Sequence, residues 1–229
     1  MKSIAELKRE AAEFAADKVK SGTVVGLGSG STAAWAVKRI GARLAEGELK
    51  DIVGIPTSLA TQLLAESCDI PLTTFDSHIK IDLTIDGADE VDREFNLIKG
   101  GGGALYREKI VAQITEFEMI IVDENKMVPR LGTDWAVPIE VVPFGWQTQV
   151  EFLTELGGDV RLRHTADGEV FYTDQQNVIL DTNFGPIEDC RLLADRLKRR
   201  TGIVDHGLFI DLTHAVVVAK QSGIEYLEK

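Results

Sequence analysis

The sequence predicts an α/β fold, and two features of its pattern carry that prediction. Up to about residue 131, short β-branched runs alternate with helical stretches, and these runs have no polar face. Such alternation is typical of a parallel sheet covered on both sides, so we expect a Rossmann-like, doubly wound, mainly parallel sheet. Beyond that point the order becomes strand, helix, hairpin, helix, strand, which indicates a smaller ferredoxin-like α+β domain.

The 229 residues are enough for one large domain or two small ones. We expect residues 1–132 and 207–229 to form the Rossmann-like domain. Residues 133–206 are expected to form the ferredoxin-like domain. The last apolar run, 215–219, is short and β-branched, and is expected to return to the first sheet.

The first element is a helix with a marked start. Ser3 and Glu6 fit a capping box, in which each side chain accepts a hydrogen bond from the backbone of the other residue. Apolar residues then recur on one face at helical spacing, at Ile4, Leu7, Ala11, Phe14 and Ala15. Gly22 is expected to end this helical stretch.

The remaining elements follow from apolar runs and the breakers between them. In the first domain the expected strands are residues 23–27, 51–55, 81–85 and 119–122, and the expected helices are residues 33–44, a segment from 56–58 onward, and residues 105–114. In the second domain the expected strands are 137–142 and 203–209, and the expected helices are 146–156 and 187–200. Between those helices an Asp167-Gly168 turn predicts a hairpin of residues 160–163 and 170–172, with 177–181 prolonging its second strand.

The composition excludes several classes of protein. With 37 acidic and 25 basic side chains the formal net charge is −12, which opposes a non-specific grip on nucleic acid or on an anionic membrane. No apolar run approaches 18 residues and the N-terminal segment is charged, so a cytoplasmic location is expected. A small anionic substrate stays open because a local pocket can invert the sign of the charge.

Cysteine and histidine predict no metal site. Cys68 and Cys190 are too few for a disulfide framework, lack metal-ligand spacing, and are expected to be buried, inert thiols. The four histidines, which share no short ligand spacing, are His78, His164, His206 and His214.

The first chemical candidate is the glycine- and hydroxyl-rich segment 26–32, between the first strand of the sheet and the next helix. Glycines let a backbone approach a ligand closely, and N–H groups at a helix start bind anions. Ser29, Ser31 and Thr32 add hydroxyl groups for phosphate or sugar oxygens. A tight strand-to-helix turn is the alternative. A Walker loop would need a Lys after the last Gly, and the third Gly that a dinucleotide loop requires is missing after Gly30.

Acidic residues gather at the end of another apolar strand, at residues 86–92. Four carboxylates within seven residues at the carboxyl end of a strand predict a polar site, with a solvated turn as the alternative. Asp86 and Asp89 flank two small residues, so both carboxylates can face one cavity. The alternating oxygen ligands and terminal Glu of a calcium loop are absent.

Four consecutive glycines, residues 100–103, stand between Lys99 and a predicted helix that carries Glu108 near its start. Such a run is costly in backbone entropy, which indicates a function. Successive N–H groups at a helix start form an oxyanion or phosphate nest, and Lys99 adds positive charge; a flexible linker is the alternative. Lys126 follows the strand 119–122, where it is placed to face a phosphate.

Taken together, these motifs resemble the ribose-5-phosphate isomerase A family over nearly the whole chain, in order. The segments that carry the resemblance are Gly28-Ser29-Gly30-Ser31-Thr32, Asp86-Gly87-Ala88-Asp89-Glu90, Lys99-Gly100-Gly101-Gly102 and Arg107-Glu108-Lys109, extended by 123–126, Pro138-Ile139-Glu140-Val141 and Gly207-Leu208-Phe209. The chain departs from the family pattern at Ser29, where Thr is frequent, and at Gly103, where Ala is usual.

The resemblance implies interconversion of D-ribose 5-phosphate and D-ribulose 5-phosphate in the non-oxidative pentose phosphate pathway, without metal or cofactor, by a homodimer or homotetramer. It implies that residues 1–132 and 207–229 form the catalytic domain and that residues 133–206 are a candidate oligomer interface. It implies that Glu108 is the proton acceptor. It also implies that substrate contacts come from Ser29, Gly30, Ser31, Thr32, Asp86, Gly87, Ala88, Asp89, Lys99, Gly100, Gly101, Gly102 and Lys126.

The chemistry of these residue types agrees with that implication. Aldose–ketose isomerisation moves a proton between C2 and C1 through an enediolate, so one carboxylate, Glu108, can remove and return it. Lys99 and the nearby N–H groups would stabilise the negative oxygen. Asp86 is assigned to ring opening, with Asp89 orienting hydroxyls. Glu108 is expected to need a raised pKa, through partial burial, to act near neutral pH.

Two other functions are kept as alternatives. An amino-sugar phosphate isomerase/deaminase would share such a first loop but would need a histidine-centred ring-opening site, and no histidine here lies in a motif. A non-catalytic sugar-phosphate sensor would need a DNA-binding helix pair, for which the first strand begins too early.

Overall fold

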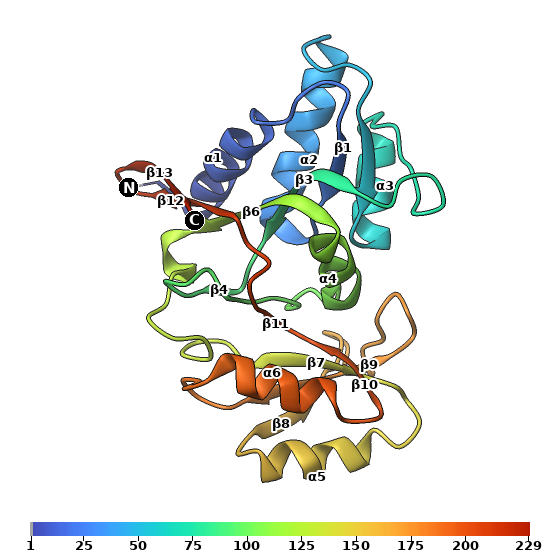
Figure 1. Cartoon of the computed structure of the whole chain (residues 1–229), viewed down its shortest axis with the longest axis vertical. Helices are drawn as coiled ribbons and strands as arrows, with labels where there is room; N and C mark the ends of the chain where they lie inside the picture. The colour runs from blue at the N-terminus through green and yellow to red at the C-terminus, as the bar shows by residue number, and fades with distance from the viewer. Residues whose placement is uncertain (1) are drawn as a thin grey trace. The chain divides into compact units, whose positions relative to one another are not determined.

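The computed structural model describes residues 2–229 and divides the chain into two compact units (Figure 1). The first unit comprises the chain up to Ala88, Arg107–Met127 and Leu212–Lys229, and the second comprises Asp89–Tyr106 and Val128–Asp211. The expected domain division differs in the segment 89–106, which it assigned to the Rossmann-like domain. This segment groups with the second unit because its short strands pair with residues near position 208.

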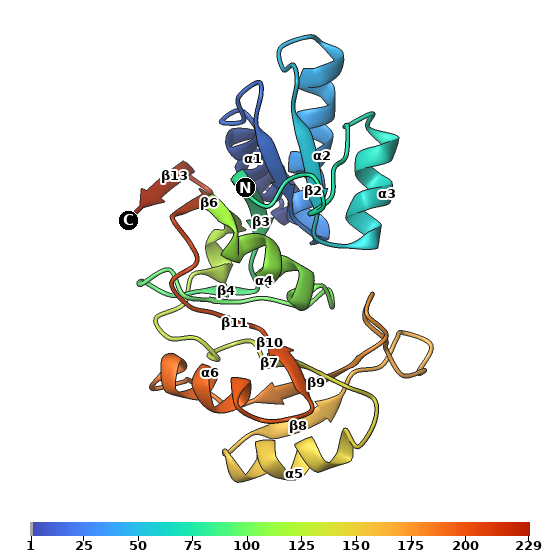
Figure 2. The same ribbon diagram turned by 45° about the vertical axis from the view of Figure 1, so that its right-hand side comes forward.

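The chain's first helix, α1 (Ile4–Ala16), begins with the predicted capping box. Ser3 Oγ accepts a hydrogen bond from the Glu6 N–H at 3.3 Å, and the Glu6 carboxylate accepts one from the Ser3 N–H at 2.7 Å. The helix ends at Ala16, well before Gly22, because Asp17 already closes its last turn. Its buried face packs against helix α2 (Gly30–Ala45), and the two helices lie side by side (Figure 2).

The first unit is built on a six-stranded sheet with the order β13-β12-β6-β3-β1-β2. Its strands are β1 (Val24–Leu27), β2 (Val53–Pro56), β3 (Ile81–Gly87), β6 (Thr115–Asp123), β12 (Ala215–Lys220) and β13 (Gly223–Glu228). All neighbours are parallel except β12 and β13. The predicted parallel sheet and the return of residues 215–219 are therefore confirmed, whereas β13 was not predicted.

Both faces of this sheet are covered, as the doubly wound fold requires. Val25 and its face neighbours belong to the large apolar cluster that α1 and α2 cover. The next side chain back along β1, Val24, points to the opposite face and packs with Ile55 and with Val111 of helix α4 (Leu105–Gln113). The remaining helix, α3 (Leu59–Ser67), follows β2. No helix among residues 2–229 is long and apolar enough to cross a membrane.

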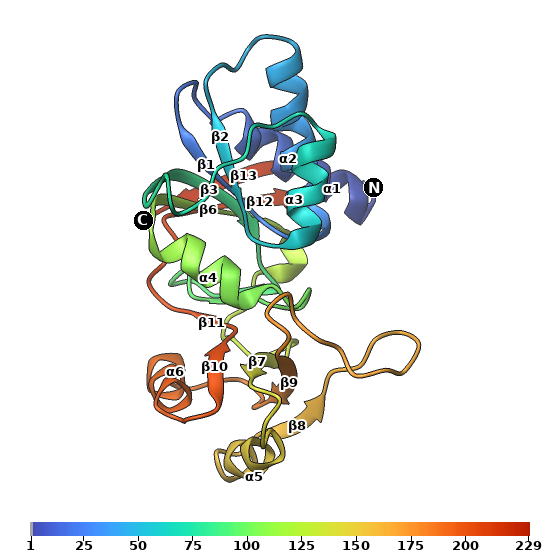
Figure 3. The ribbon, with the colours of Figure 1, turned by 90° about the vertical axis from the view of Figure 1, so that its right-hand side faces the viewer.

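The second unit contains a four-stranded antiparallel sheet with the order β10-β7-β9-β8. Its elements are β7 (Val137–Val141), α5 (Gln147–Glu155), β8 (Asp159–Leu162), β9 (Val178–Asn183), α6 (Cys190–Lys198) and β10 (Ile203–His206). Leu153 of α5 and Leu197 of α6 join the same apolar cluster as Ile139, so both helices cover one face (Figure 3). This order and connectivity confirm the ferredoxin-like prediction.

A second sheet of this unit joins β4 (Glu90–Val91), β5 (Leu97–Ile98) and β11 (Leu208–Phe209) in the order β11-β5-β4. Both pairings are antiparallel. This small sheet positions Lys99, which directly follows β5.

The predicted hairpin of residues 160–163 and 170–172 is confirmed only next to its turn, where the Phe171 N–H donates to the Arg163 carbonyl at 3.0 Å. The segment 177–181, predicted to prolong the second strand, supplies the partner of β8. Strand β8 pairs with β9, so Arg161 faces Asp181, while Val170 and Tyr172 form only isolated bridges. The apolar residues Val178 and Leu180 are buried and Tyr172 is exposed, so burial favours β9 as the partner of β8. The Asp167-Gly168 turn lies at the tip of the intervening segment.

Glu140, on β7, is buried and has 0% exposure. One of its carboxylate oxygens accepts hydrogen bonds from Thr173 Oγ1 and Asn177 Nδ2, each at 2.8 Å. Burial nevertheless raises the pKa of Glu140, and the negative charge of Asp205 adds to that effect. The charged form of Glu140 is therefore disfavoured in the folded protein.

Replacing Glu140 with Gln should make the protein more stable at neutral and alkaline pH. A carboxyl with a raised folded pKa contributes stability that is complete below its unfolded pKa, near 4.5, and is lost as the pH rises through the folded value. Gln keeps the acceptor for Thr173 and Asn177 without the charge. We expect the melting temperature of Glu140→Gln to rise relative to that of wild type as the pH increases from 5 to 8. The shift is about 2–4 °C for each kcal/mol of unfolding free energy.

The control is Glu151→Gln, at an exposed position on α5, which should track the wild-type melting curve at every pH. If the difference between Glu140→Gln and wild type were the same at all pH values, the inferred titration of Glu140 would be wrong.

Candidate active site

The first glycine-rich loop lies between β1 and α2, where Gly28 allows two strands to approach closely. A Cβ at Gly28 would collide with the side chain of Asp86, at the end of β3. The Asp86 carboxylate, 1% exposed, accepts hydrogen bonds from the Ser29 N–H at 3.0 Å and the Gly87 N–H at 2.7 Å. The structure thus brings two of the predicted motifs together through one carboxylate oxygen.

A cluster of four hydroxyl groups lies beside this loop, at the start of α3. Ser29 Oγ is 2.7 Å from Thr57 Oγ1, 2.7 Å from Ser58 Oγ and 3.1 Å from Thr61 Oγ1. Thr61 in turn donates to the Gly28 carbonyl at 3.0 Å. The Ser29 hydroxyl therefore ties the first loop to the segment after β2 instead of capping α2. Sequence reasoning missed this cluster; its only signal was the polar run after an apolar strand.

The start of α2 presents a set of donors. Gly30 and Ser31 are exposed and Thr32 is half-buried, and their N–H groups belong to the helix start that attracts anions. Lys8, on α1, places its ammonium 2.9 Å from Ser31 Oγ. Lys8 was not predicted, because only the packing of α1 against α2 brings it here. The resulting group of one cation, hydroxyls and N–H groups suits a phosphate.

Strand β6 ends beside β3 in the parallel sheet and leads into a 3₁₀ turn, η1 (Glu124–Lys126). Asp123, buried, accepts hydrogen bonds from the Asn125 N–H at 3.2 Å and from Asn125 Nδ2 at 2.9 Å. This turn fixes the backbone of the half-buried Lys126 at the carboxyl edge of the sheet. Sites in such sheets form at that edge.

Lys99 is 2% exposed, a burial that is rare for lysine. Its N–H donates to the Gly207 carbonyl at 2.9 Å, and its ammonium lies 5.6 Å from the centre of the Phe209 ring. A cation over an aromatic face is stabilised by the ring's quadrupole. Lys99 and residues 207–209, which both belong to the segments that carry the resemblance, therefore lie side by side in the second unit.

The glycine run after Lys99 is a shaped loop. Its Gly101 N–H donates to Asp89 at 2.8 Å, and the Gly103 N–H closes a turn on the Gly100 carbonyl at 2.9 Å. Gly100 and Gly103 have φ values of +100° and +83°, which side chains rarely adopt. Hydrogen bonding and positive φ both argue against the flexible-linker alternative.

Helix α4 begins directly after this loop and carries Glu108 in its first turn. Glu108 is 6% exposed, so its carboxylate is shielded from bulk water, as the sequence analysis expected. Of the predicted residues, Ser29–Thr32, Asp86–Ala88, Glu108 and Lys126 belong to the first unit, and Asp89 and Lys99–Gly102 belong to the second.

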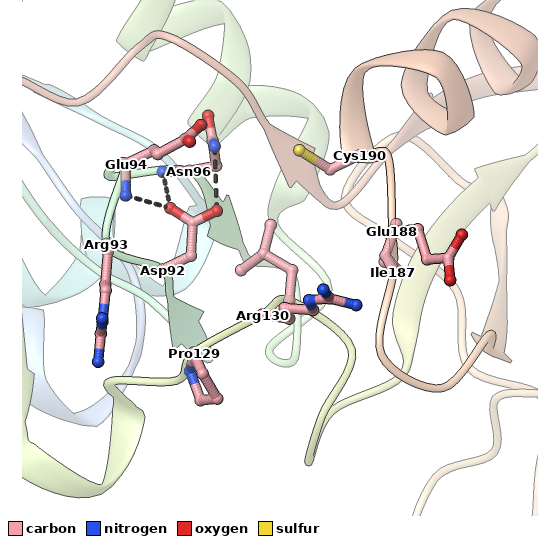
Figure 4. Close-up of a pocket in the computed structure, with 10 residues that line it drawn as sticks. Asp92, Arg93, Glu94, Asn96, Pro129, Arg130, Ile187, Glu188 and Cys190 are labelled. Atoms are coloured by element: carbon pink, nitrogen blue, oxygen red, sulfur yellow. Dashed lines mark hydrogen bonds between the residues drawn. The ribbon is translucent and has the colours of Figure 1, made fainter.

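A separate cavity of about 310 Å³ in the second unit contains none of the predicted site residues. Figure 4 shows Asp92 there, with its carboxylate bonded to the backbone of Glu94 and Asn96 and to the Asn96 amide. Cys190 also lines it, half-buried, and burial raises the pKa of its thiol. Both cysteines are half-buried instead of buried as predicted, and the raised pKa of Cys190 lowers its thiolate fraction. Residues 2–229 contain no group of three or more His, Cys, Asp or Glu placed to hold a metal ion.

Comparison with known sequences identifies a family. The model for ribose 5-phosphate isomerase A (phosphoriboisomerase A) matches residues 53–223. The chain is 52% identical over 222 residues to ribose-5-phosphate isomerase A of Desulfatibacillum aliphaticivorans, covering 97% of this chain and 96% of that protein. It is 52% identical over 220 residues to the enzyme of the same name from Chloroflexus aurantiacus, covering 96% and 92%.

Solved structures agree with the sequence comparison. A D-ribose-5-phosphate isomerase in complex with phospho-erythronic acid has 38% identity and a TM-score of 0.97, with 100% of both chains covered. The ribose 5-phosphate isomerase of Plasmodium falciparum has 43% identity and a TM-score of 0.95, covering 98% of this chain and 99% of that one.

Replacing Gly28 with Ala should destabilise the first unit. The new methyl group would displace the Asp86 side chain and disrupt its bonds to Ser29 and Gly87. Overpacking of this kind costs about 1–3 kcal/mol, so we expect a clearly lower melting temperature. The control is Gly102→Ala, since nothing lies within 4 Å of the Cβ it adds. Equal melting temperatures for the two variants would contradict the close approach of β1 and β3.

Proposed function

The chain belongs to the ribose-5-phosphate isomerase A family and isomerises ribose 5-phosphate, and we propose that Glu108 is the group that carries the proton. The observation that carries this assignment is a carboxylate, 6% exposed, in the first turn of the helix that follows a structured glycine loop. Of the acids in the predicted motifs, Glu108 is the one placed at such a helix start.

The chemistry needs one base acting on neighbouring carbons. In the open-chain aldose, Glu108 removes the proton from C2, and the electron pair moves to the C1 oxygen to form an enediolate. Glu108 then returns the proton to C1, while the proton of the C2 hydroxyl passes to the C1 oxygen, which leaves a ketone at C2. No oxidant or reductant is consumed, so the step needs no redox cofactor. The proposal assigns charge stabilisation to side chains and backbone N–H groups of this chain and includes no metal.

Lys99 and the N–H groups of Gly100 and Gly102 are assigned to the negative oxygens of the enediolate, while the Gly101 N–H is held by Asp89. A buried cation and fixed N–H donors stabilise developing charge more strongly than water does, because they are already oriented. Phospho-erythronic acid, bound in the related structure, carries a planar carboxylate with two such oxygens. We expect it to bind to the same groups here.

The phosphate is assigned to the start of α2, with Lys8, Ser31 and Thr32 as its principal contacts and Lys126 as a further cation. The supporting geometry is the 2.9 Å contact of Lys8 with Ser31 at an exposed helix start. Ser29 is assigned an indirect part, because its hydroxyl is already shared among three neighbours.

Ring opening is assigned to Asp86, with Gly87, Ala88 and Asp89 contacting sugar hydroxyls. One Asp86 oxygen holds two backbone N–H groups, which orients the carboxylate toward a defined side. A place in the non-oxidative pentose phosphate pathway, a cytoplasmic location and assembly as a homodimer or homotetramer complete the proposal.

Wild-type protein incubated with ribose 5-phosphate and EDTA should form the ketose, and Glu108→Gln should lose this activity. Removal of a general base lowers kcat by about 10²–10⁴-fold, and Gln preserves the shape of the side chain. Ketose formation gives the rate, and calorimetric titration with phospho-erythronic acid shows whether the site is intact. Glu116→Gln, at an exposed position, is the control. Near wild-type turnover by Glu108→Gln would exclude it as the base.

Replacing Lys99 should lower kcat more than it raises KM, since the enediolate needs the cation more than the substrate does. Lys99→Met retains the apolar stem against Phe209, so it separates loss of charge from loss of packing; Lys99→Ala removes both. Steady-state kinetics at saturating and limiting substrate give the two constants. An effect confined to KM would make Lys99 a phosphate anchor instead.

A further inference from the structure

Arg163 reaches the glycine loop from a distant part of the second unit. It directly follows β8, and its side chain is 13% exposed. Its Nη1 donates hydrogen bonds to the Gly100 carbonyl at 2.9 Å and to the Gly101 carbonyl at 3.1 Å. Two successive carbonyl groups of the loop are thereby directed toward one guanidinium.

The guanidinium is itself held in place. Its Nε donates to Asp181 on β9 at 2.8 Å, and its Nη2 makes a second, shorter bond to the same carboxylate. The Phe171 ring lies 5.7 Å from the centre of the guanidinium. A bidentate Arg–carboxylate pair has little freedom to rotate, so Arg163 presents its remaining donors in a fixed direction.

The loop bonds fix where its N–H groups point. In a trans peptide the C=O and the following N–H face opposite ways, and residues 2–229 contain no cis peptide bond. The Gly101 N–H, opposite the Gly100 carbonyl, donates to Asp89 at 2.8 Å. The Gly102 N–H, opposite the Gly101 carbonyl, therefore points away from Arg163. Gly102 is exposed, and nothing lies within 4 Å of the position that a Cβ would take.

The segment from Arg163 to Phe171 also fixes the other end of the glycine loop, at Gly103. A Cβ on Gly103 would collide with the Phe171 ring, and Phe171 is bonded through its N–H to the Arg163 carbonyl at 3.0 Å. The positive charge behind the two carbonyls also polarises their peptide groups, which makes the N–H groups on the far side stronger donors. Orientation and polarisation thus come from one residue.

We propose that Arg163 is a positioning residue of the isomerisation, which aligns Gly100–Gly102 so that the Gly102 N–H faces the enediolate oxygen. The proposal rests on the function proposed above for Lys99–Gly102. Arg163 touches the loop's carbonyl side, so it acts through the loop and not on the substrate.

Arg163→Met should lower kcat by about 10²-fold with little change in KM, because a misplaced donor costs most in the transition state. Binding of phospho-erythronic acid should weaken by a similar factor, since its carboxylate needs the same N–H. The matched control is Arg161→Met, two residues earlier on β8, whose side chain is 80% exposed and pairs only at the surface with Asp159. Its kinetics should equal those of wild type.

A second variant separates positioning from folding. Arg163→Met leaves Asp181 without its cation and is expected to lower the melting temperature. Arg163→Met/Asp181→Asn removes the unpaired charge and should regain stability while kcat stays low. Arg163→Lys keeps the charge but not the planar fork, and should recover only part of kcat.

Recovery of kcat together with stability in the double variant would overturn the proposal, as would a kcat near wild type in Arg163→Met. Those outcomes differ from failure of the proposed function, which would appear as absent turnover by the wild type or as unchanged kcat in Lys99→Met.

Discussion

Carboxylates that accept hydrogen bonds from glycine-loop N–H groups are the constraint on which the rest of the candidate site depends. Glycine loops lose much backbone entropy when ordered, so something must hold them. Asp86 holds the Ser29 and Gly87 N–H groups, and Asp89 holds that of Gly101. Hydrogen bonds to charged groups contribute about 1.5–3 kcal/mol each, more than neutral ones. Because a carboxylate holds one N–H group of each loop, the remaining N–H groups of that loop are held in the direction of the substrate.

This constraint accounts for part of the chain's acidity. A net charge of −12 seems unfavourable for binding a phosphorylated sugar. Several acids, however, are turned inward onto the backbone: buried Glu90 accepts hydrogen bonds from the N–H groups of Gly132, Asp134 and Trp135 at 2.5, 2.6 and 2.8 Å. Because these carboxylates are paired with internal N–H groups, the local potential at the site is set by its lysines and its remaining donors.

The parts of this molecule that the sequence predicts are those set by local pattern. The Ser3–Glu6 capping box depends on residues three apart, and the parallel strands follow from apolar runs, so both were predictable. The glycine motifs were predictable as parts of a site because a run of glycines is costly in backbone entropy and therefore indicates a function. The pairing of β8 was not, because the turn at Asp167-Gly168 is a local signal, whereas burial of β9 is a property of the assembled unit.

The missed site residues share one physical cause. Lys8 reaches Ser31 across 23 positions, Thr61 reaches Ser29 across 32, and Arg163 reaches Gly100 across 63. A single Lys, Thr or Arg has no local signature, since its role depends on what tertiary packing places opposite it.

Distant contacts also surround Ser29 and Gly103, the two positions at which the sequence is expected to depart from the family pattern. Ser29 keeps the hydroxyl oxygen that contacts its three hydroxyl neighbours, and these contacts need no methyl group. At Gly103, a φ of +83° and the Phe171 ring leave no room for a methyl group. In this chain the space at position 103 is limited by an aromatic residue 68 positions away (171 − 103), on the segment that also carries Arg163. That segment both occupies the space beside Gly103 and holds the carbonyls of Gly100 and Gly101. The glycine loop and the segment therefore depend on each other, and we expect a substitution in one to be tolerated only with a compensating substitution in the other.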